Sequence, residues 1–192
     1  MPEGVNIMFV KLRKKKQMHM NAVVSGEQLP AENIKDEIFA QQLLGKTFAI
    51  KPQDDMITAP VSGTLEVLYP TGHAFAIRME NGAGVLVHIG IDTVSLKGKG
   101  FQIFCKQGDK VEQDQPIVRC NVENLVAEGY DMTVMMIVTQ LPADAKDVSF
   151  ISKRNISQVF NAETFIIGLC SGVLGILICL IVLVPANQII HS

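Results

Sequence analysis

The sequence predicts an all-β domain, an antiparallel β-sandwich or distorted barrel, followed by a single C-terminal transmembrane helix. Over residues 21–142, short runs rich in Val, Ile, Phe and Thr alternate with turn-forming residues. Residues 165–184 are apolar and uncharged, and at about 1.5 Å per residue a helix of that length spans a bilayer core. A domain of about 120 residues can bury a core without disulfides.

The same patterns divide the chain into five segments. Residues 1–20 form a basic leader, and 21–142 form the β domain. Residues 143–164 are polar and read as a linker, 165–184 as the transmembrane helix, and 185–192 as a short tail. The leader mixes lysines with apolar residues, so it could form either a helix on the membrane surface or a solvated, disordered tail.

The β domain is expected to contain nine strands and one short helix. Asn81-Gly82 between two apolar runs is a strong hairpin signal, because both residues tolerate positive φ. Apolar spacing over residues 36–44 favours an amphipathic helix. The strands are expected near Ala22–Val24, Thr47–Lys51, Met56–Ala59, Gly63–Tyr69, Ala74–Met79, Gly84–His88, Phe101–Cys105, Pro116–Asn121 and Met132–Thr139.

The net charge of −2 conceals a strong asymmetry along the chain. Residues 1–20 carry five basic side chains and one acidic side chain, whereas residues 21–150 carry ten basic and 17 acidic ones. An acidic domain argues against nucleic acid as a partner, because phosphate binding needs a basic face. It favours a basic protein partner.

The cysteines, and the charges on either side of the apolar run 165–184, predict the cellular compartment. No CxxC pair or metal-ligand spacing occurs, which favours reduced thiols in a cytoplasmic protein. Lys153 and Arg154 precede the apolar run and no Lys or Arg follows it, so the positive-inside rule places residues 1–160 in the cytoplasm, anchored to the membrane by the C-terminal span. The four cysteines are Cys105, Cys120, Cys170 and Cys179.

Two histidines lie where chemistry is expected. His88 stands in an otherwise aliphatic strand, and His73 precedes the neighbouring strand. A hairpin through Asn81-Gly82 brings the two near each other, displaced by about two residues. Facing imidazoles suit metal binding, acid–base catalysis or a nucleophile with a stabilising partner, and a lone histidine is often only a satisfied core residue. With only two histidines in the domain, a zinc hydrolase lacks its ligand set.

Several motifs, in order, closely resemble the glucose-type IIA domain of the bacterial phosphoenolpyruvate-dependent sugar phosphotransferase system. The match is collinear over about residues 22–141, and its specificity comes from the combination of motifs. The motifs are DEIFA (36–40), GKTFAIKP (45–52), APVSGT (59–64), TGHAF (71–75) and GAGVLVHIGIDTV (82–94).

The resemblance implies an antiparallel β-sandwich and a phosphoryl relay. His88 is implied to be the phosphorylated residue, which takes the group from the phosphocarrier protein HPr and passes it to a cysteine of a IIB domain. His73 is implied to hold the phosphoryl group, and Thr71 to hydrogen-bond in the site. The implied partner-docking residues are Asp36, Asp92, Phe39, Tyr69, Phe75 and Leu86, of which Tyr69 and Leu86 stand where members often have Phe.

The expected partners are therefore HPr, a IIB/IIC sugar permease and the membrane. No cofactor is expected, apart from a zinc ion bridging His73, His88 and a partner's carboxylate. The alternative function is a membrane-tethered regulatory docking module whose phosphorylation reports sugar supply. The APVSGT motif also suggests a lipoyl or biotinyl carrier, but no lysine sits at the expected hairpin tip.

Overall fold

The computed structural model of the chain describes residues 16–142, 145–151 and 156–158, and within them the fold is mostly β. The helical elements are short. The strands are β1 (Lys16–Asn21), β2 (Gly26–Leu29), β3 (Lys46–Pro52), β4 (Met56–Thr58), β5 (Gly63–Leu68), β6 (Ala74–Arg78), β7 (Gly84–Ile89), β8 (Phe101–Ile103), β9 (Lys110–Val111), β10 (Pro116–Cys120), β11 (Val134–Gln140), β12 (Ala145–Ile151) and β13 (Ile156–Gln158). The helices are η1 (Ala31–Asn33), α1 (Glu37–Ala40), η2 (Thr93–Leu96) and α2 (Val122–Ala127).

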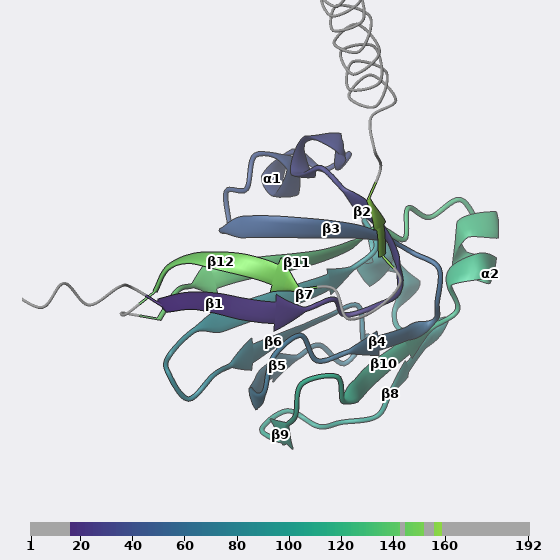
Figure 1. Cartoon of the computed structure of the whole chain (residues 1–192). Helices are drawn as coiled ribbons and strands as arrows, with labels where there is room; N and C mark the ends of the chain where they lie inside the picture. Colours follow the sequence, from purple (N-terminus) through teal and green to yellow (C-terminus); the bar gives the residue numbers. More distant parts are fainter. Residues whose placement is uncertain (1–15, 143–144, 152–155, 159–192) are drawn as a thin grey trace, which may run out of the picture. The chain divides into compact units, whose positions relative to one another are not determined.

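Three sheets make the sandwich (Figure 1). The largest has the order β13-β2-β3-β11-β7-β6-β5-β9, the second has β4-β10-β8, and the third pairs β1 with β12. Because β7 lies between β11 and β6, both of its edges are hydrogen-bonded, and a residue on it is held from two sides. This strand carries His88.

The main core lies between the inner face of the large sheet and the other two layers. Strand alternation supplies it: Val85, Val87 and Ile89 of β7 point inward and are fully buried. A second, smaller core lies on the outer face of β3 and β11, under η1 and α1 (Figure 1). It consists of Ile34, Phe39, Ala49, Met135 and Ile137.

The structure corrects the predicted fold class, which included a C-terminal transmembrane helix. In residues 16–142, 145–151 and 156–158, no helix is long and apolar enough to cross a membrane. The α-helices there have four and six residues, whereas a bilayer core requires about 20. Residues 165–184 themselves lie outside the described residues. The fold class of the described residues is thus mostly β. The prediction that residues 1–160 lie in the cytoplasm, anchored by the span, loses its basis with the span.

Strands also occupy parts of the expected leader and linker. β1 begins at Lys16, inside the leader 1–20, and β12 lies inside the linker 143–164. The two pair in parallel, as the purple and green strands of Figure 1 show, although only antiparallel pairing was expected. His19 and Ser149, which hydrogen-bond across the pair, are 130 positions apart, so no local turn announces it.

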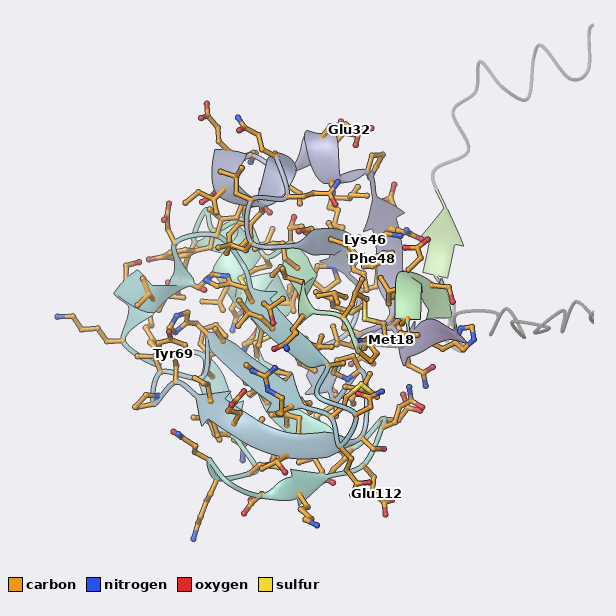
Figure 2. The ribbon with its side chains drawn as sticks, turned by 90° about the vertical axis from the view of Figure 1, so that its left-hand side faces the viewer. Met18, Glu32, Lys46, Phe48, Tyr69 and Glu112 are labelled. Atoms are coloured by element: carbon orange, nitrogen blue, oxygen red, sulfur yellow. The ribbon has the colours of Figure 1, made fainter. Side chains whose placement is uncertain are left out.

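The strand β12 is fastened to β3 by polar and aromatic contacts. Lys46 Nζ lies 2.7 Å from Asp147 Oδ1. The Phe48 and Phe150 rings stack, with centroids 5.5 Å apart. Figure 2 shows Lys46 and Phe48 close together on this part of the domain. These contacts, with Ala145 and Val148 buried, hold a strand inside the segment that was expected to be a polar linker.

Several element predictions differ from the structure. Ala22–Val24 is a buried bend, not a strand, and the carbonyl of Val23 accepts from the backbone N–H and hydroxyl of Thr58. The helix expected over 36–44 ends at Ala40. The helix α2 was not anticipated, although Asn121 caps it by accepting from the backbone N–H of Asn124.

Candidate functional site

The hairpin between β6 and β7 brings the two histidines together. Ala74 lies opposite His88, and the His73 carbonyl accepts from the backbone N–H of Ile89 at 2.8 Å. The displacement is therefore one residue, not two. His73 precedes the first residue of β6 and follows Gly72, whose φ is +73°, so the pleat does not dictate the direction of its side chain. The two rings meet edge to face, with centroids 5.4 Å apart.

A backbone carbonyl sets the tautomer of His88. Nδ1 of His88 lies 2.9 Å from the carbonyl oxygen of Gly90. Because a carbonyl oxygen can only accept, Nδ1 carries the proton and donates it. Nε2 of the neutral ring then holds the free electron pair. The nucleophilic nitrogen of His88 is thus Nε2.

The turn that supplies this carbonyl is tightly packed. Gly90 has φ +73°, and a Cβ there would lie 2.5 Å from Cγ2 of Thr93 and 3.0 Å from the carbonyl oxygen of Asp131. The hydroxyl of Thr93 donates to the carbonyl of Ile89 at 2.6 Å. Glycine is therefore required at position 90 both for backbone conformation and for space.

His73 is the more enclosed of the two histidines, with only 6% of its surface exposed. Its Nδ1 is hydrogen-bonded to the hydroxyl of Thr71, the threonine for which the family resemblance implied a hydrogen bond in the site. The Tyr69 ring packs against it, with centroids 5.0 Å apart. When the Thr71 hydroxyl donates to Nδ1, the proton of His73 resides on Nε2, which becomes a hydrogen-bond donor for a bound anion.

Burial keeps both imidazoles neutral. Desolvation lowers the pKa of His73 below its usual 6.5. The pKa of His88 is also lowered, first by desolvation and then by the nearby His73, against the opposing effects of the Gly90 carbonyl and of the carboxylates of Asp36 and Asp92. Near pH 7 both rings are therefore uncharged, and His88 retains its nucleophilic electron pair.

The two predicted aspartates lie near His88. Asp36 caps α1, because its carboxylate accepts from the backbone N–H of Ile38 at 2.8 Å. Asp92 is exposed, and its φ of +57° places it in the left-handed region. Both carboxylates are close enough to raise the pKa of His88. Two carboxylates thus lie near a neutral nucleophile.

The expected docking residues divide by burial. Tyr69 is 47% exposed, and Figure 2 shows it on the opposite side of the view from Met18 of β1. Leu86 is half-buried, and Phe39 is buried with its ring 5.2 Å from the His88 ring. Phe75 is fully buried in the main core, so its prediction as a docking residue is wrong. Alternation along β6 turns Phe75 inward, next to the outward-facing Ala76.

Other apolar side chains near the site are exposed and were not predicted as docking residues. Ile38, Leu43 and Leu44 surround Phe39 in sequence, and Val94 follows Asp92. The apolar spacing of the first three was visible in the sequence, but it was interpreted as the apolar face of a longer helix. The helix ends at Ala40, so Leu43 and Leu44 lie beyond it, whereas Ile38 lies within it and is exposed all the same. Exposed apolar residues of this kind mark protein interaction surfaces.

A metal site is incomplete on this chain. Across the described ranges, no group of three or more His, Cys, Asp or Glu side chains is placed to hold a metal ion. The two imidazoles supply half of a tetrahedral zinc set. A bridging zinc would thus take its further ligands from a partner, and this stays a prediction.

Comparisons with known proteins agree with the geometry. The family model described as "phosphoenolpyruvate-dependent sugar phosphotransferase system, EIIA 1" matches residues 18–143. A glucose-specific EIIA component of Staphylococcus epidermidis is 32% identical over 83% of this chain and 97% of its own length. A beta-glucoside-specific EIIBCA component of Bacillus subtilis is 38% identical over 62% of this chain and 20% of its own length.

A solved structure supports the same assignment. The glucose permease IIA of Mycoplasma capricolum is similar with a TM-score of 0.60 and 35% identity, over 62% of this chain and 78% of that one. The family match covers both histidines and every strand from β2 to β11. The chain therefore belongs to the EIIA 1 family of the phosphoenolpyruvate-dependent sugar phosphotransferase system.

Proposed function

We propose that Nε2 of His88 is the phosphoryl acceptor through which this chain acts as the IIA component of a sugar phosphotransferase system. A IIA component is a phosphotransferase relay protein, and family membership assigns that general role. The observation that carries the proposal is the hydrogen bond from His88 Nδ1 to the Gly90 carbonyl, which leaves Nε2 free. A neutral imidazole with a free Nε2 is a competent nucleophile near pH 7.

The relay requires two in-line transfers. In the first, Nε2 of His88 attacks phosphorus, and the bond from phosphorus to the histidine of phospho-HPr breaks with its electrons returning to that histidine. In the second, a cysteine thiolate of a IIB domain attacks the same phosphorus, and the bond to His88 breaks with its electrons returning to Nε2. Neither step needs a further reagent, so the protein has to position and shield the group.

His73 and Thr71 support the transferring group. In this proposal the Thr71 hydroxyl donates to Nδ1 of His73, so that Nε2 carries the proton and donates toward the phosphoryl oxygens. A positioned donor of this kind stabilises charge that develops in the transition state. Because His73 is buried, this donor stays in a setting of low dielectric, where it is more effective than in water.

The surface around His88 suits the docking of HPr and a IIB domain. Exposed Tyr69 and half-buried Leu86 offer apolar area, with Phe39 supporting the His88 ring from below. Asp36 and Asp92 provide negative charge near His88, which speeds encounter with a basic surface. Glucose or a β-glucoside is the proposed sugar class, because relatives carry those specificities in their names.

A zinc ion at the partner interface is a further proposal for this site. The two imidazoles would supply two nitrogens, and a carboxylate of the partner would supply oxygen. Zinc should then tighten binding of a IIB domain to the wild-type chain and have no effect on His73→Ala. Equal tightening of both by calorimetry would contradict a site built on these histidines.

A reconstituted transfer assay tests the relay. The full chain is incubated with phosphoenolpyruvate labelled with ³²P, Enzyme I and HPr, and a IIB domain is then added. Wild type should accept and pass on the label, His88→Ala should accept none, and His73→Ala should accept it but pass it on slowly. His19→Ala is the matched control, since this exposed histidine lies on β1, where its ring is hydrogen-bonded to Ser149. Label on His88→Ala refutes the assignment, and label that never leaves wild type favours a regulatory docking module.

A further inference from the structure

The segment 131–133, just before β11, holds the turn that sets the His88 tautomer. The backbone N–H of Gly90 donates to the Thr133 carbonyl at 3.0 Å. The backbone N–H of Ile91 donates to the Asp131 carbonyl at 2.7 Å. The Gly90 carbonyl therefore keeps its place only while this segment keeps its shape.

A carboxylate gives the segment that shape. Asp131 Oδ1 accepts from the backbone N–H of Thr133 at 3.1 Å and from its hydroxyl at 2.6 Å. Thr133 is buried, and the Asp131 side chain is only 25% exposed. Burial alone would raise the pKa of Asp131, but the Thr133 donors and Lys35 outweigh it and lower that pKa. The carboxylate is thus ionised and hydrogen-bonded at neutral pH.

The same carboxylate reaches the other side of the site. Asp131 Oδ2 lies 3.2 Å from Nζ of Lys35, which immediately precedes Asp36, the cap of α1. The Lys35 side chain is 78% exposed, and exposed ion pairs contribute little to stability. The Thr133 hydrogen bonds are therefore the stronger of the two links.

We propose that Asp131 is a positioning residue for the phosphoryl relay. Its carboxylate fixes residues 131–133, these fix the Gly90 carbonyl, and the carbonyl holds the proton on Nδ1 of His88. The proposal rests on the proposed role of His88 as the acceptor. Asp131 touches neither histidine, so it acts only through the Gly90 turn.

The test measures the His88 tautomer and the transfer rate on the same variants. The full chain is labelled with ¹⁵N in histidine, and the ring nitrogen shifts of His88 are assigned with His88→Ala. In Asp131→Ala the Nε2-protonated tautomer should appear, and the initial rate of phosphoryl acceptance should fall by up to about a hundredfold. Asp131→Asn should retain most of both, because its amide oxygen still accepts from Thr133.

A carboxylate elsewhere provides the control. Asp147 on β12 likewise accepts from a backbone N–H, that of Val148 at 2.8 Å, and pairs with a lysine, Lys46, at 2.7 Å. Asp147→Ala should leave the tautomer and the rate unchanged. The proposal is overturned if Asp131→Ala keeps the wild-type tautomer and rate, or if Asp147→Ala alters them equally.

A milder variant covers a failure of Asp131→Ala to fold. Thr133→Val removes one donor to Asp131 and keeps the buried volume, so it should shift the tautomer in the same direction by a smaller amount. No shift in Thr133→Val would overturn the proposal. If the wild-type chain accepts no phosphoryl group, the proposed function fails, whereas the tautomer measurement still decides the role of Asp131.

Discussion

Replacing Gly90 with alanine tests whether the turn beside His88 depends on glycine for space as well as for conformation. A non-glycine residue in the left-handed region costs about 1–2 kcal/mol. The added Cβ would also lie 2.5 Å from Cγ2 of Thr93 and 3.0 Å from the Asp131 carbonyl oxygen. Overpacking of this kind costs about 1–3 kcal/mol, so Gly90→Ala should lower the free energy of unfolding by about 2–5 kcal/mol in total.

Gly82 separates the two contributions. Its φ is +85°, but a Cβ there meets nothing within 4 Å. Gly82→Ala should therefore cost only the conformational part, about 1–2 kcal/mol. Urea denaturation of both variants gives the two free energies, and the transfer assay gives the rate. Gly90→Ala should also slow phosphoryl acceptance, because the carbonyl partner of His88 moves, while Gly82→Ala should not.

The result that would refute the reasoning is an equal loss of stability in the two alanine variants. It would mean that the contacts around Gly90 relax without cost. A stable Gly90→Ala that accepts phosphate at the wild-type rate would, separately, refute the role of the Gly90 carbonyl. A large fraction of total stability is at stake, since domains are stable by only about 5–15 kcal/mol.

Three further predictions concern the site and its surroundings. By NMR, His88 should titrate with a midpoint below 6.5, and His73→Ala should raise that midpoint. Because the pKa values of both histidines are lowered in the folded state, the unfolded chain binds more protons below pH 6.5. The free energy of unfolding should therefore fall as the pH drops below 6.5 and be unaffected by these groups above it. A His88 midpoint at or above 6.5 would contradict the effect of burial. Neutralising Asp36 and Asp92 to Asn should slow phosphoryl acceptance and flatten its dependence on salt in stopped flow, and an unchanged salt dependence would remove the aspartates from docking. Phe75→Ala should lower the free energy of unfolding by about 3–5 kcal/mol, because Phe75 is fully buried. Tyr69→Ala should leave the free energy of unfolding nearly unchanged and raise the KM for phospho-HPr, and the reverse pattern would restore Phe75 to the docking surface.

The pairing of His73 with His88 was readable from the sequence because it depends on local geometry. Asn81-Gly82 announces the turn, which places the two strands side by side; His73 lies just outside β6, after Gly72 with its φ of +73°, and its ring meets that of His88 there. The displacement was off by one residue because the exact centre of the turn depends on hydrogen bonds that the sequence pattern leaves open. The role of Thr71 was implied only by the family resemblance, and the structure shows its hydroxyl bonded to Nδ1 of His73, two residues away.

Contacts between distant segments were beyond the reach of the sequence pattern. The parallel pairing of β1 with β12 joins residues 130 positions apart, and no periodicity encodes such a pair. The exposure of Leu43 and Leu44 likewise depends on where α1 stops. Phe75 was expected among the docking residues from the family resemblance, but its place on the inner face of β6 buries it in the core.

The sequence by itself thus determined the fold class of the β domain and singled out His73 and His88 as neighbours, because strand patterns and the turn at Asn81-Gly82 act over short distances. Only the tertiary structure decided which nitrogen of His88 is free. That depends on the Gly90 carbonyl. The turn that carries this carbonyl is hydrogen-bonded to the backbone carbonyls of Asp131 and Thr133, which lie just before β11. The tautomer of a histidine is set by whatever lies opposite its ring, and packing alone brings that group there.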